Sequence, residues 1–333
     1  MSMGKKVRAF AVAAAVGLVV LAIVLATRPG EKAATAGENA SLDAGISVAK
    51  PGVQKVDYTI DLNTGVMTPL PKAIIQSLRE TAEGEWAESQ YAASPDGSPI
   101  AYVGTGDEGS LQIFIAAIDG TGVRQVTNDP RGATSPAWSP NARTIAYAGY
   151  GSGDVRNLFI LDVATGETRQ VTDGTHDVWD SQFTPDGSSL VYTGGTDQVP
   201  LLMTVPVAGG KSTLLIGPSD GVTDTGNGSL SPDGSLVTFL GGGWPEEGPG
   251  HCGPCRFVAN ADGTGRRVIP GWMANPAGTW SSDGSRIVAM EQTGPDTDPF
   301  IVIVEIATGD ASRVAKGNAA IWLDQDTLLV EVS

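Results

Sequence analysis

The chain has 333 residues, 41% of them hydrophobic, with 44 glycines, 21 prolines and only 6% aromatic residues. This balance favours many short strands joined by tight turns over long helices. The formal net charge is −16, and because the first 28 residues hold four basic residues and no acid, the rest of the chain carries −20. Such a charge repels phosphate backbones and excludes nucleic acid as an expected partner.

The N-terminal segment predicts a membrane anchor. Residues 1–9 contain three basic side chains and no acid, and residues 10–27 contain no charge at all, over a length that just crosses a bilayer as a helix. We expect 1–9 to be a basic cytoplasmic stub and 10–27 an uncleaved transmembrane signal-anchor, because the apolar run is long and no small-x-small cleavage site ends it. A removed signal peptide is the alternative.

The segment after the anchor predicts a tether to an extracytoplasmic domain. Residues 28–55 are rich in Ala, Gly and Glu and show no hydrophobic period, so we expect a flexible linker. No cysteine lies near the apolar run, which excludes a lipoprotein. The orientation set by the basic stub makes the protein a single-pass membrane protein with residues 56–333 outside the cytoplasm.

A turn sequence close to Ser-Pro-Asp-Gly recurs through residues 56–333. Its Asp or Asn returns at spacings of 45, 45, 47, 50 and 41 residues. Pro presets φ for a type I turn, Asp hydrogen-bonds within the turn and Gly accepts a positive φ, so the motif predicts a β-hairpin. Apolar residues four and six positions after the Asp predict a strand with one face in a core. The copies begin at Ser94, Ser139, Thr184, Ser231 and Ser281, with a faint sixth at Leu323-Asp324.

A second, Gly-containing turn alternates with the first and completes a four-stranded unit. Five full units occupy residues 87–317, while a half unit near residues 56–70 and another at 318–333 add up to a sixth. A single four-stranded sheet with two apolar faces cannot bury both, so such units pack face to face around an axis. The sequence therefore predicts an all-β, six-bladed β-propeller closed by N- and C-terminal half blades, preceded by a transmembrane helix.

Trp138-Ser139-Pro140, echoed by Phe183 to Gly187, carries a family resemblance. The chain resembles the TolB-like and WD-repeat-like six-bladed propeller family, whose repeat has the Trp-Ser-Pro-Asp-Gly hairpin. The resemblance covers about residues 56–333. It departs from TolB itself, since no separate N-terminal α/β domain precedes the propeller and an anchor is expected. The resemblance implies a fold and leaves the partner open.

The blade topology sorts the connections onto two faces. Both kinds of hairpin turn fall on one face, which we expect to be structural, and the longer variable loops fall on the opposite face. Recognition usually resides in variable loops on a rigid scaffold, so we expect binding there. The candidate binding residues are His176, Asp177, Trp179, Asp180, Asp224, Trp244, His251 and Trp272. Trp138, Trp280 and Trp322 occupy or adjoin the repeated strand position and are predicted core residues.

These loop residues have plainer interpretations as well. Amphipathic tryptophans can simply cover the ends of blades, whereas the sharper hypothesis makes them anchors of a contact surface with a polar rim. The acidic residues could bind Ca²⁺, but no run matches the alternating ligands of an EF-hand loop, and most acidic clusters are only solvated. The sequence predicts no metal site and no cofactor.

His251-Cys252-Gly253-Pro254-Cys255 looks like a thioredoxin motif, whose chemistry needs the first cysteine at a helix N-terminus. Here a Pro/Gly/Glu loop precedes the motif and a strand, residues 256–260, follows it. We predict a structural disulfide between Cys252 and Cys255, because two close thiols outside the cytoplasm usually pair. Redox activity and a zinc site completed by His176 and His251 are the alternatives.

Catalytic motifs are sparse. The chain has no Gly-x-Ser-x-Gly elbow, no phosphate-binding loop and only two histidines, so we predict no catalytic residues and no enzyme activity. The expected function is a protein-binding or scaffold module with a protein partner at the cell envelope. The alternative is a small-molecule or glycan-binding sensor or lyase that uses the channel mouth.

Overall fold

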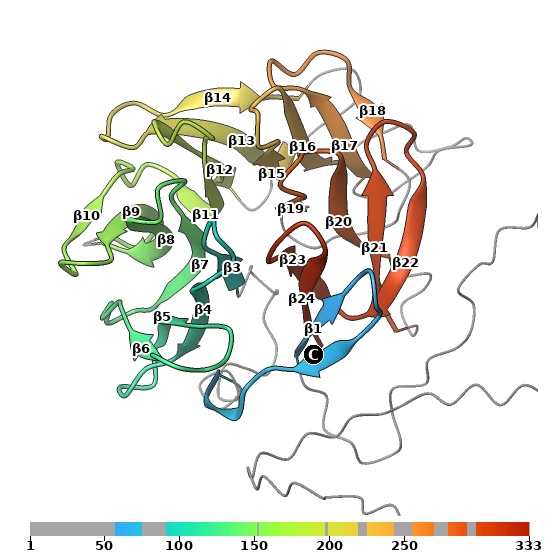
Figure 1. Ribbon diagram of the computed structural model, residues 1–333. Coiled ribbons are helices and arrows are strands. Elements are labelled where there is room, and N and C mark those ends of the chain that lie inside the picture. The colour runs from blue at the N-terminus through green and yellow to red at the C-terminus, as the bar shows by residue number, and fades with distance from the viewer. Residues whose placement is uncertain are drawn as a thin grey trace, which may run out of the picture. The chain divides into compact units, whose positions relative to one another are not determined.

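Antiparallel strand pairing organises the part of the chain that the structure, a computed structural model, describes: residues 57–74, 91–151, 153–196, 199–218, 225–242, 255–269, 279–291 and 298–332. These residues form six four-stranded sheets, which are arranged as blades around a central axis (Figure 1). The prediction of an all-β, six-bladed propeller is confirmed.

The predicted stub, membrane anchor and linker, residues 1–55, lie outside the described residues. Within the ranges given above, no helix is both long enough and apolar enough to cross a membrane. The anchor and the extracytoplasmic location stay predictions from the sequence.

Each of blades 1 to 5 follows the chain from an inner strand beside the axis to an outer strand at the rim (Figure 1). Blades 1 and 2 consist of β3 (Tyr91–Ala93), β4 (Ile100–Thr105), β5 (Leu111–Ala116), β6 (Arg124–Gln125), β7 (Ala133–Trp138), β8 (Thr144–Tyr150), β9 (Arg156–Asp162) and β10 (Thr168–Gln170). Blades 3 to 5 consist of β11 (Asp177–Phe183), β12 (Ser189–Thr196), β13 (Val199–Pro206), β14 (Thr213–Ile216), β15 (Thr225–Leu230), β16 (Leu236–Gly241), β17 (Cys255–Asn260), β18 (Arg267–Val268), β19 (Thr279–Trp280), β20 (Arg286–Glu291), β21 (Phe300–Glu305) and β22 (Ala311–Lys316).

Blade 6 joins the two ends of the propeller. Its strands β1 (Tyr58–Asp61), β2 (Met67–Pro69), β23 (Ala319–Trp322) and β24 (Thr327–Glu331) stand in the order β2-β1-β24-β23. Strand β1 pairs antiparallel with β24, with Tyr58 opposite Val330. The closure predicted from two half repeats is confirmed, and it leaves neither half with an unpaired inner edge.

The core lies in the seams between blades. Each of the six hydrophobic clusters combines side chains from two neighbouring blades, as in the cluster that joins Ile113 of blade 1 to Ile145 of blade 2. Trp138, Trp280 and Trp322 are buried in these seams, with 9%, 7% and 8% of their surfaces exposed. Their assignment as core residues is confirmed. Burial on both sheet faces is what holds the blades in a ring.

The inner hairpins, which join the first and second strands of a blade, carry the Ser-Pro-Asp-Gly turns. In blade 5 the Ser281 hydroxyl donates to Asp283 Oδ1 at 2.7 Å and accepts the Arg286 backbone N–H at 3.0 Å. Gly284 follows with a φ of 71°, a conformation that favours glycine. The same hydroxyl-to-carboxylate bond recurs in blades 1, 3 and 4, so the turn is built by its own sequence.

Candidate functional site

The structure places three predicted binding residues on a strand and not in a loop. Asp177, Trp179 and Asp180 belong to β11, the inner strand of blade 3, whereas His176 precedes it and is exposed. Asp177 Oδ1 accepts a 2.8 Å hydrogen bond from the Arg156 backbone N–H and a 3.3 Å bond from its Nε. The Arg156 guanidinium also lies 5.7 Å from the centre of the Trp179 ring. The assignment of these three residues to a variable loop is corrected.

A β-bulge is the physical reason for this correction. The pairing of β11 with β12 shifts between Trp179 and Gln182, and Asp180 has a positive φ of 51° there. An extra residue breaks the period of two on which a strand is recognised. Equivalent bulges occur in blades 2 and 4, with a φ of 52° at Ser135 and 49° at Asn227. Asp180 thus occupies a position that the repeat itself shapes.

The remaining predicted site residues are not brought together by the described structure. Asp224, Trp244, His251, Trp272 and Cys252 lie outside the described residues. Cys255 begins β17, opposite Gly241, and confirms that a strand follows the Cys-Gly-Pro-Cys motif. The disulfide and its alternatives stay predictions. Among the described residues, no group of three or more His, Cys, Asp or Glu side chains is arranged to hold a metal ion.

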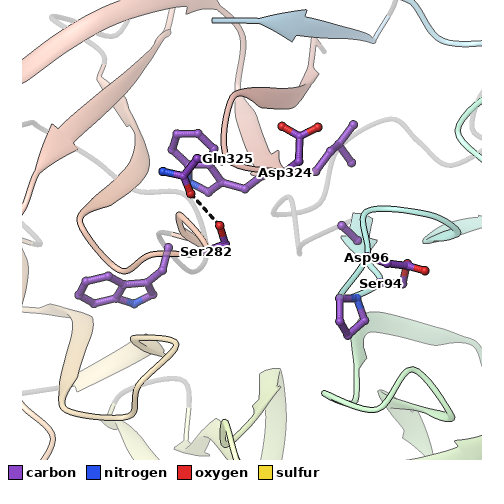
Figure 2. Close-up of a pocket in the computed structure, with 10 residues that line it drawn as sticks. Ser94, Asp96, Ser282, Asp324 and Gln325 are labelled. Atoms are coloured by element: carbon purple, nitrogen blue, oxygen red, sulfur yellow. Dashed lines mark hydrogen bonds between the residues drawn. The ribbon is translucent and has the colours of Figure 1, made fainter.

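A pocket of about 300 Å³ lies where the inner hairpins of blades 5, 6 and 1 meet, on the face of the tight turns. We call it the turn pocket. Ser94 and Asp96 of blade 1 stand across it from Ser282 of blade 5 and Gln325 of blade 6 (Figure 2). The full lining is Ala93, Ser94, Pro95, Asp96, Trp280, Ser282, Trp322, Leu323, Asp324 and Gln325. The turn face, which the sequence led us to regard as structural, therefore carries a cavity.

The turn of blade 6, which lines the turn pocket, is shorter than the other inner turns. The strand residues that face each other across the other inner turns are seven positions apart, as Trp280 and Ile287 are. In blade 6 Trp322 faces Leu328, only six positions away, and its turn lacks both the Pro and the Gly of the repeat. Blade 5 has Ser282 where blades 1 to 4 have proline.

Regular turns close against one another around the ring. A Cβ at Gly187 in blade 3 would lie 3.6 Å from Cδ of Pro140 in blade 2, an ordinary contact distance. Gly234 and Gly284 lie against the prolines of the turns before them in the same way. Between blades 6 and 1 this contact is replaced, since a Cβ at Gly97 would collide with the backbone carbonyl oxygen of Leu323. The ring of turns thus changes its packing at the turn pocket.

A polar network fixes the wall made by blades 5 and 6. Ser282 Oγ donates to Gln325 Oε1 at 2.7 Å, and Gln325 Nε2 donates to Asp283 Oδ2 at 3.0 Å (Figure 2 shows the first bond). Arg286 Nη2 donates to the Gln325 backbone oxygen at 2.7 Å, and its guanidinium lies 4.8 Å from the centre of the Trp322 ring. These bonds restrict the side chains of Ser282 and Gln325.

The opposite wall presents a carboxylate that its own turn keeps ionised. Asp96 Oδ1 accepts a 2.5 Å bond from Ser94 Oγ and a 3.2 Å bond from the Ser98 backbone N–H. These two bonds, the hydroxyl first, lower the pKa of Asp96. In blade 5, beside the pocket lining but not part of it, the Ser281 hydroxyl, followed by the Ser285 backbone N–H, holds the pKa of Asp283 well below its usual range. Both carboxylates are therefore negatively charged hydrogen-bond acceptors at neutral pH.

A second group of titratable side chains lies at the seam between blades 6 and 1, outside the turn pocket. Tyr91 Oη donates to Asp57 Oδ2 at 2.5 Å, and the Val332 backbone N–H donates to Asp57 Oδ1 at 2.8 Å. Burial, followed by the charge of Asp57, raises the pKa of Glu331 to about 8. Burial also raises the pKa of Asp57, against the two hydrogen bonds. The closing seam therefore holds a proton at neutral pH.

The fold is similar to that of several solved structures. The chain is similar to TolB from Acinetobacter baumannii, with a TM-score of 0.58 and 14% identity over 83% of this chain and 63% of that one. It is similar to an oligogalacturonate lyase from Vibrio parahaemolyticus, with a TM-score of 0.52 and 12% identity over 83% and 97% of the two chains. A chain of a nidogen/laminin complex matches with a TM-score of 0.51 and 14% identity over 66% and 76%.

Identities this low show a shared fold and not a shared activity. The chain also spans only 63% of the length of the Acinetobacter TolB chain. No curated protein sequence matches it significantly. Residues 89–243, which run from the start of blade 1 into blade 4, match the family model of the TolB beta propeller domain. The described residues thus form a six-bladed β-propeller whose fold is similar to that of TolB, and residues 89–243 match the TolB beta propeller domain.

Proposed function

We propose that this protein is a membrane-anchored, extracytoplasmic binding or scaffold module that receives a protein partner of the cell envelope on its turn face, and that it is not an enzyme. The observation that supports this most directly is the turn pocket. It lies where the turn of blade 6 lacks the Pro and the Gly of the repeat and the turn of blade 5 has Ser282 in place of the Pro that blades 1 to 4 share. Six similar blades suffice to close a ring, so a departure that opens a pocket and fixes polar groups around it serves a purpose other than closure.

The electrostatics of the turn pocket favour binding over proton transfer. A general acid or base works best with a pKa near the operating pH. Hydrogen bonds within the turn instead lower the pKa of Asp96, which lines the turn pocket. This carboxylate is suited to accept hydrogen bonds from a ligand and unsuited to exchange a proton at neutral pH.

The alternative is a small-molecule or glycan-binding sensor or lyase that uses the channel mouth. The turn pocket, at about 300 Å³, is at the small end of the range for ligand pockets, so a small ligand would fit in it. The oligogalacturonate lyase relative supports it through the fold alone, at 12% identity.

Site-specific photo-crosslinking in intact cells tests the proposal. A photoreactive amino acid replaces Pro95, which is exposed at the rim of the turn pocket, in the full chain. The matched control carries the same group at Val199, which is 45% exposed and follows the second strand of blade 3, so it lies on the opposite face. We expect one envelope protein to be captured reproducibly from Pro95 and not from Val199.

The outcomes separate the two candidates. Capture of the same protein from Val199 alone moves binding to the variable face and overturns the turn-face proposal. Absence of a captured protein, together with saturable binding of a small molecule or oligosaccharide by the purified chain, supports the alternative. Turnover of that ligand, measured as product formed, overturns the assignment as a non-enzyme.

A further inference from the structure

We propose that Asp57, Tyr91 and Glu331 form a proton-operated latch, which holds the C-terminal strands in the ring while a proton is bound and loosens them when the proton is released. The latch lies at the closing seam between blades 6 and 1, where strands from both ends of the propeller meet (Figure 1). It is a conformational device of the fold and is independent of the face that binds a partner.

Strand register places the two carboxyl groups of the latch opposite each other. Tyr58 of β1 pairs with Val330 of β24, and both pack in the seam toward blade 5. Asp57 and Glu331 are the next residues along these two strands. Because successive side chains of a strand alternate between its faces, both carboxyl groups are on the side of blade 1. Like charges directly opposite each other on paired strands are destabilising.

Hydrogen bonds distinguish the two carboxyl groups. Asp57 accepts bonds from Tyr91 Oη at 2.5 Å and from the Val332 backbone N–H at 2.8 Å, and donors of this kind favour a carboxylate. Glu331 is only 9% exposed, and burial, followed by the charge of Asp57, raises its pKa to about 8. The pair therefore keeps a proton at neutral pH, and the charge of Asp57 opposes the loss of that proton from Glu331.

The surroundings offer no positive charge that replaces the proton. Among the described residues, no Lys or Arg forms an ion pair with either carboxyl group of the latch. Burial, followed by the charge of Asp57, raises the pKa of Tyr91 well above its usual range, and the neighbouring Tyr102 acts in the same direction. On the side of blade 5, the Lys316 ammonium pairs with Asp298 at 3.0 Å. Release of the proton thus leaves two like charges in a buried seam.

The latch joins two strands that are not consecutive in the chain. In blades 1 to 5 the second and third strands follow each other directly, whereas in blade 6 these positions belong to β24 and β1. Separation of β24 from β1 therefore leaves every strand pair of blades 1 to 5 intact. Proteins open locally where a unit can separate without the rest of the fold. The closing seam is such a place.

The coupling between the proton and opening has a definite sign. The pKa of Glu331 is about 8 in the closed seam and returns toward its ordinary value of 4.5 when the seam opens to water. Between these values the closed seam holds the proton more tightly, so each pH unit favours opening by about tenfold. The latch is firmest below the lower value, and the effect is complete above the upper one. The seam thus loosens from mildly acidic to neutral pH.

Hydrogen exchange followed by mass spectrometry tests the latch in the purified full chain. Exchange is measured from pH 5 to 8 on peptides that cover β24 and on peptides that cover β12 of blade 3, away from the closing seam. Protection is the intrinsic exchange rate at each pH divided by the measured rate. We expect β24 to be less protected than β12 and to lose protection by about tenfold per pH unit.

Substitutions assign the effect to the latch. Glu331→Gln keeps the shape of the protonated side chain and has no proton to release, so the protection of β24 should be independent of pH. Asp57→Asn keeps Glu331 and removes the charge that opposes its ionisation, so the loss of protection should level off at a lower pH. Glu305→Gln, at an exposed position in blade 5, is the matched control and should keep the native profile.

Each contrary outcome overturns the latch. Protection of β24 that does not change with pH in the native chain, or a pH dependence that survives in Glu331→Gln, would mean that this proton does not control the seam. Equal protection of β24 and β12 would mean that the whole propeller opens at once. Should Glu331→Gln fail to fold, an unchanged profile in Asp57→Asn would overturn the latch by itself.

Discussion

The inner turns of blades 2 to 4 contact their neighbours in a different way from those of blades 5 and 6. In blades 2 to 4 a proline follows the Ser or Thr of every turn, and the glycine of the next turn packs against it. Blades 5 and 6 lose that proline, and blade 6 also loses one residue and the glycine. Hydrogen bonds of Gln325 to Ser282 and Asp283 replace the apolar contact. The ring therefore requires contact between neighbouring turns, but this contact can be apolar or made of hydrogen bonds.

Removing the closing half blade is the strongest test, because it breaks blade 6 and leaves the regular blades intact. Deletion of residues 318–333 removes β23 and β24, so β1 keeps only β2 as a partner and its inner edge is exposed. We expect aggregation or loss of cooperative unfolding, followed by circular dichroism and size-exclusion chromatography. A truncated chain that melts as the intact one does would refute closure by β1 and β24.

Glycine substitutions compare the two kinds of contact between turns directly. Gly187→Ala places a Cβ at ordinary distance from Pro140 and should cost about 1–2 kcal/mol, the strain of a φ of 69° for alanine. Gly97→Ala has the same strain and also collides with the Leu323 carbonyl, so it should cost about 1–3 kcal/mol more. Urea unfolding measures both changes in the free energy of unfolding. Equal changes would mean that the Leu323 backbone shifts to accept the added Cβ at little cost.

The pH dependence of stability should distinguish the closing seam from the others. The pKa of Glu331 is raised from 4.5 to about 8, so between these values the folded chain keeps a proton that the unfolded chain has released. The contribution of this proton is complete below the lower value and is lost as the pH rises through 8. Glu331→Gln should therefore become more stable than the native chain by about 1–3 kcal/mol at pH 9, and by less at pH 5.

Glu305→Gln is the matched control for this measurement. Glu305 is exposed at the end of β21 in blade 5, away from Asp57 and Tyr91. Urea unfolding of the two variants from pH 5 to 9 should show a rising gain for Glu331→Gln and a flat difference for Glu305→Gln. A flat difference for both would mean that Glu331 is ionised in the folded chain at neutral pH.

The features that could be predicted from the sequence are those that each repeat encodes locally. Pro and Gly in the turn, a Ser that bonds to the following Asp, and apolar residues at a spacing of two specify one hairpin, and their recurrence gives the blade number and the closure. The strand that contains the bulge at Asp180 was not predicted, because the bulge separates the buried residues Val178 and Phe183 by an odd number of positions. A search for strict alternation cannot find a strand of that kind.

The turn pocket could not be predicted from any single repeat. Its walls come from three turns that only the closed ring brings together, with Asp96 and Asp324 at opposite ends of the propeller sequence. A signal was nevertheless present. The sixth copy of the motif is faint, with Leu323-Asp324 in place of Ser-Pro-Asp-Gly, and the fifth has Ser282 in place of proline. Positions where a repeat loses its consensus, next to each other in the ring, mark where the fold has been altered locally.

Introducing the proline of the repeat into the turn of blade 5 should have the smallest effect on stability. Ser282→Pro makes this turn match those of blades 1 to 4. It removes the hydrogen bond from Ser282 Oγ to Gln325, worth about 0.5–1.5 kcal/mol, while proline at a compatible turn position gains about 0.4–1 kcal/mol from the unfolded chain. The two terms nearly cancel, so the free energy of unfolding should change by less than about 0.5–1 kcal/mol.

Binding should respond to the same substitution far more than stability does. Proline removes a polar group from the wall of the turn pocket and releases Gln325 from one of its two side-chain partners, so the preorganised wall is lost. We expect capture from Pro95 to fall several-fold while urea unfolding stays nearly unchanged. Pro232→Ser, which introduces the blade 5 residue into blade 4, is the reciprocal control and should leave capture unaltered. A large loss of stability in Ser282→Pro would show that this serine is required by the fold, and unchanged capture would show that the departure from the repeat in blade 5 has no part in recognition.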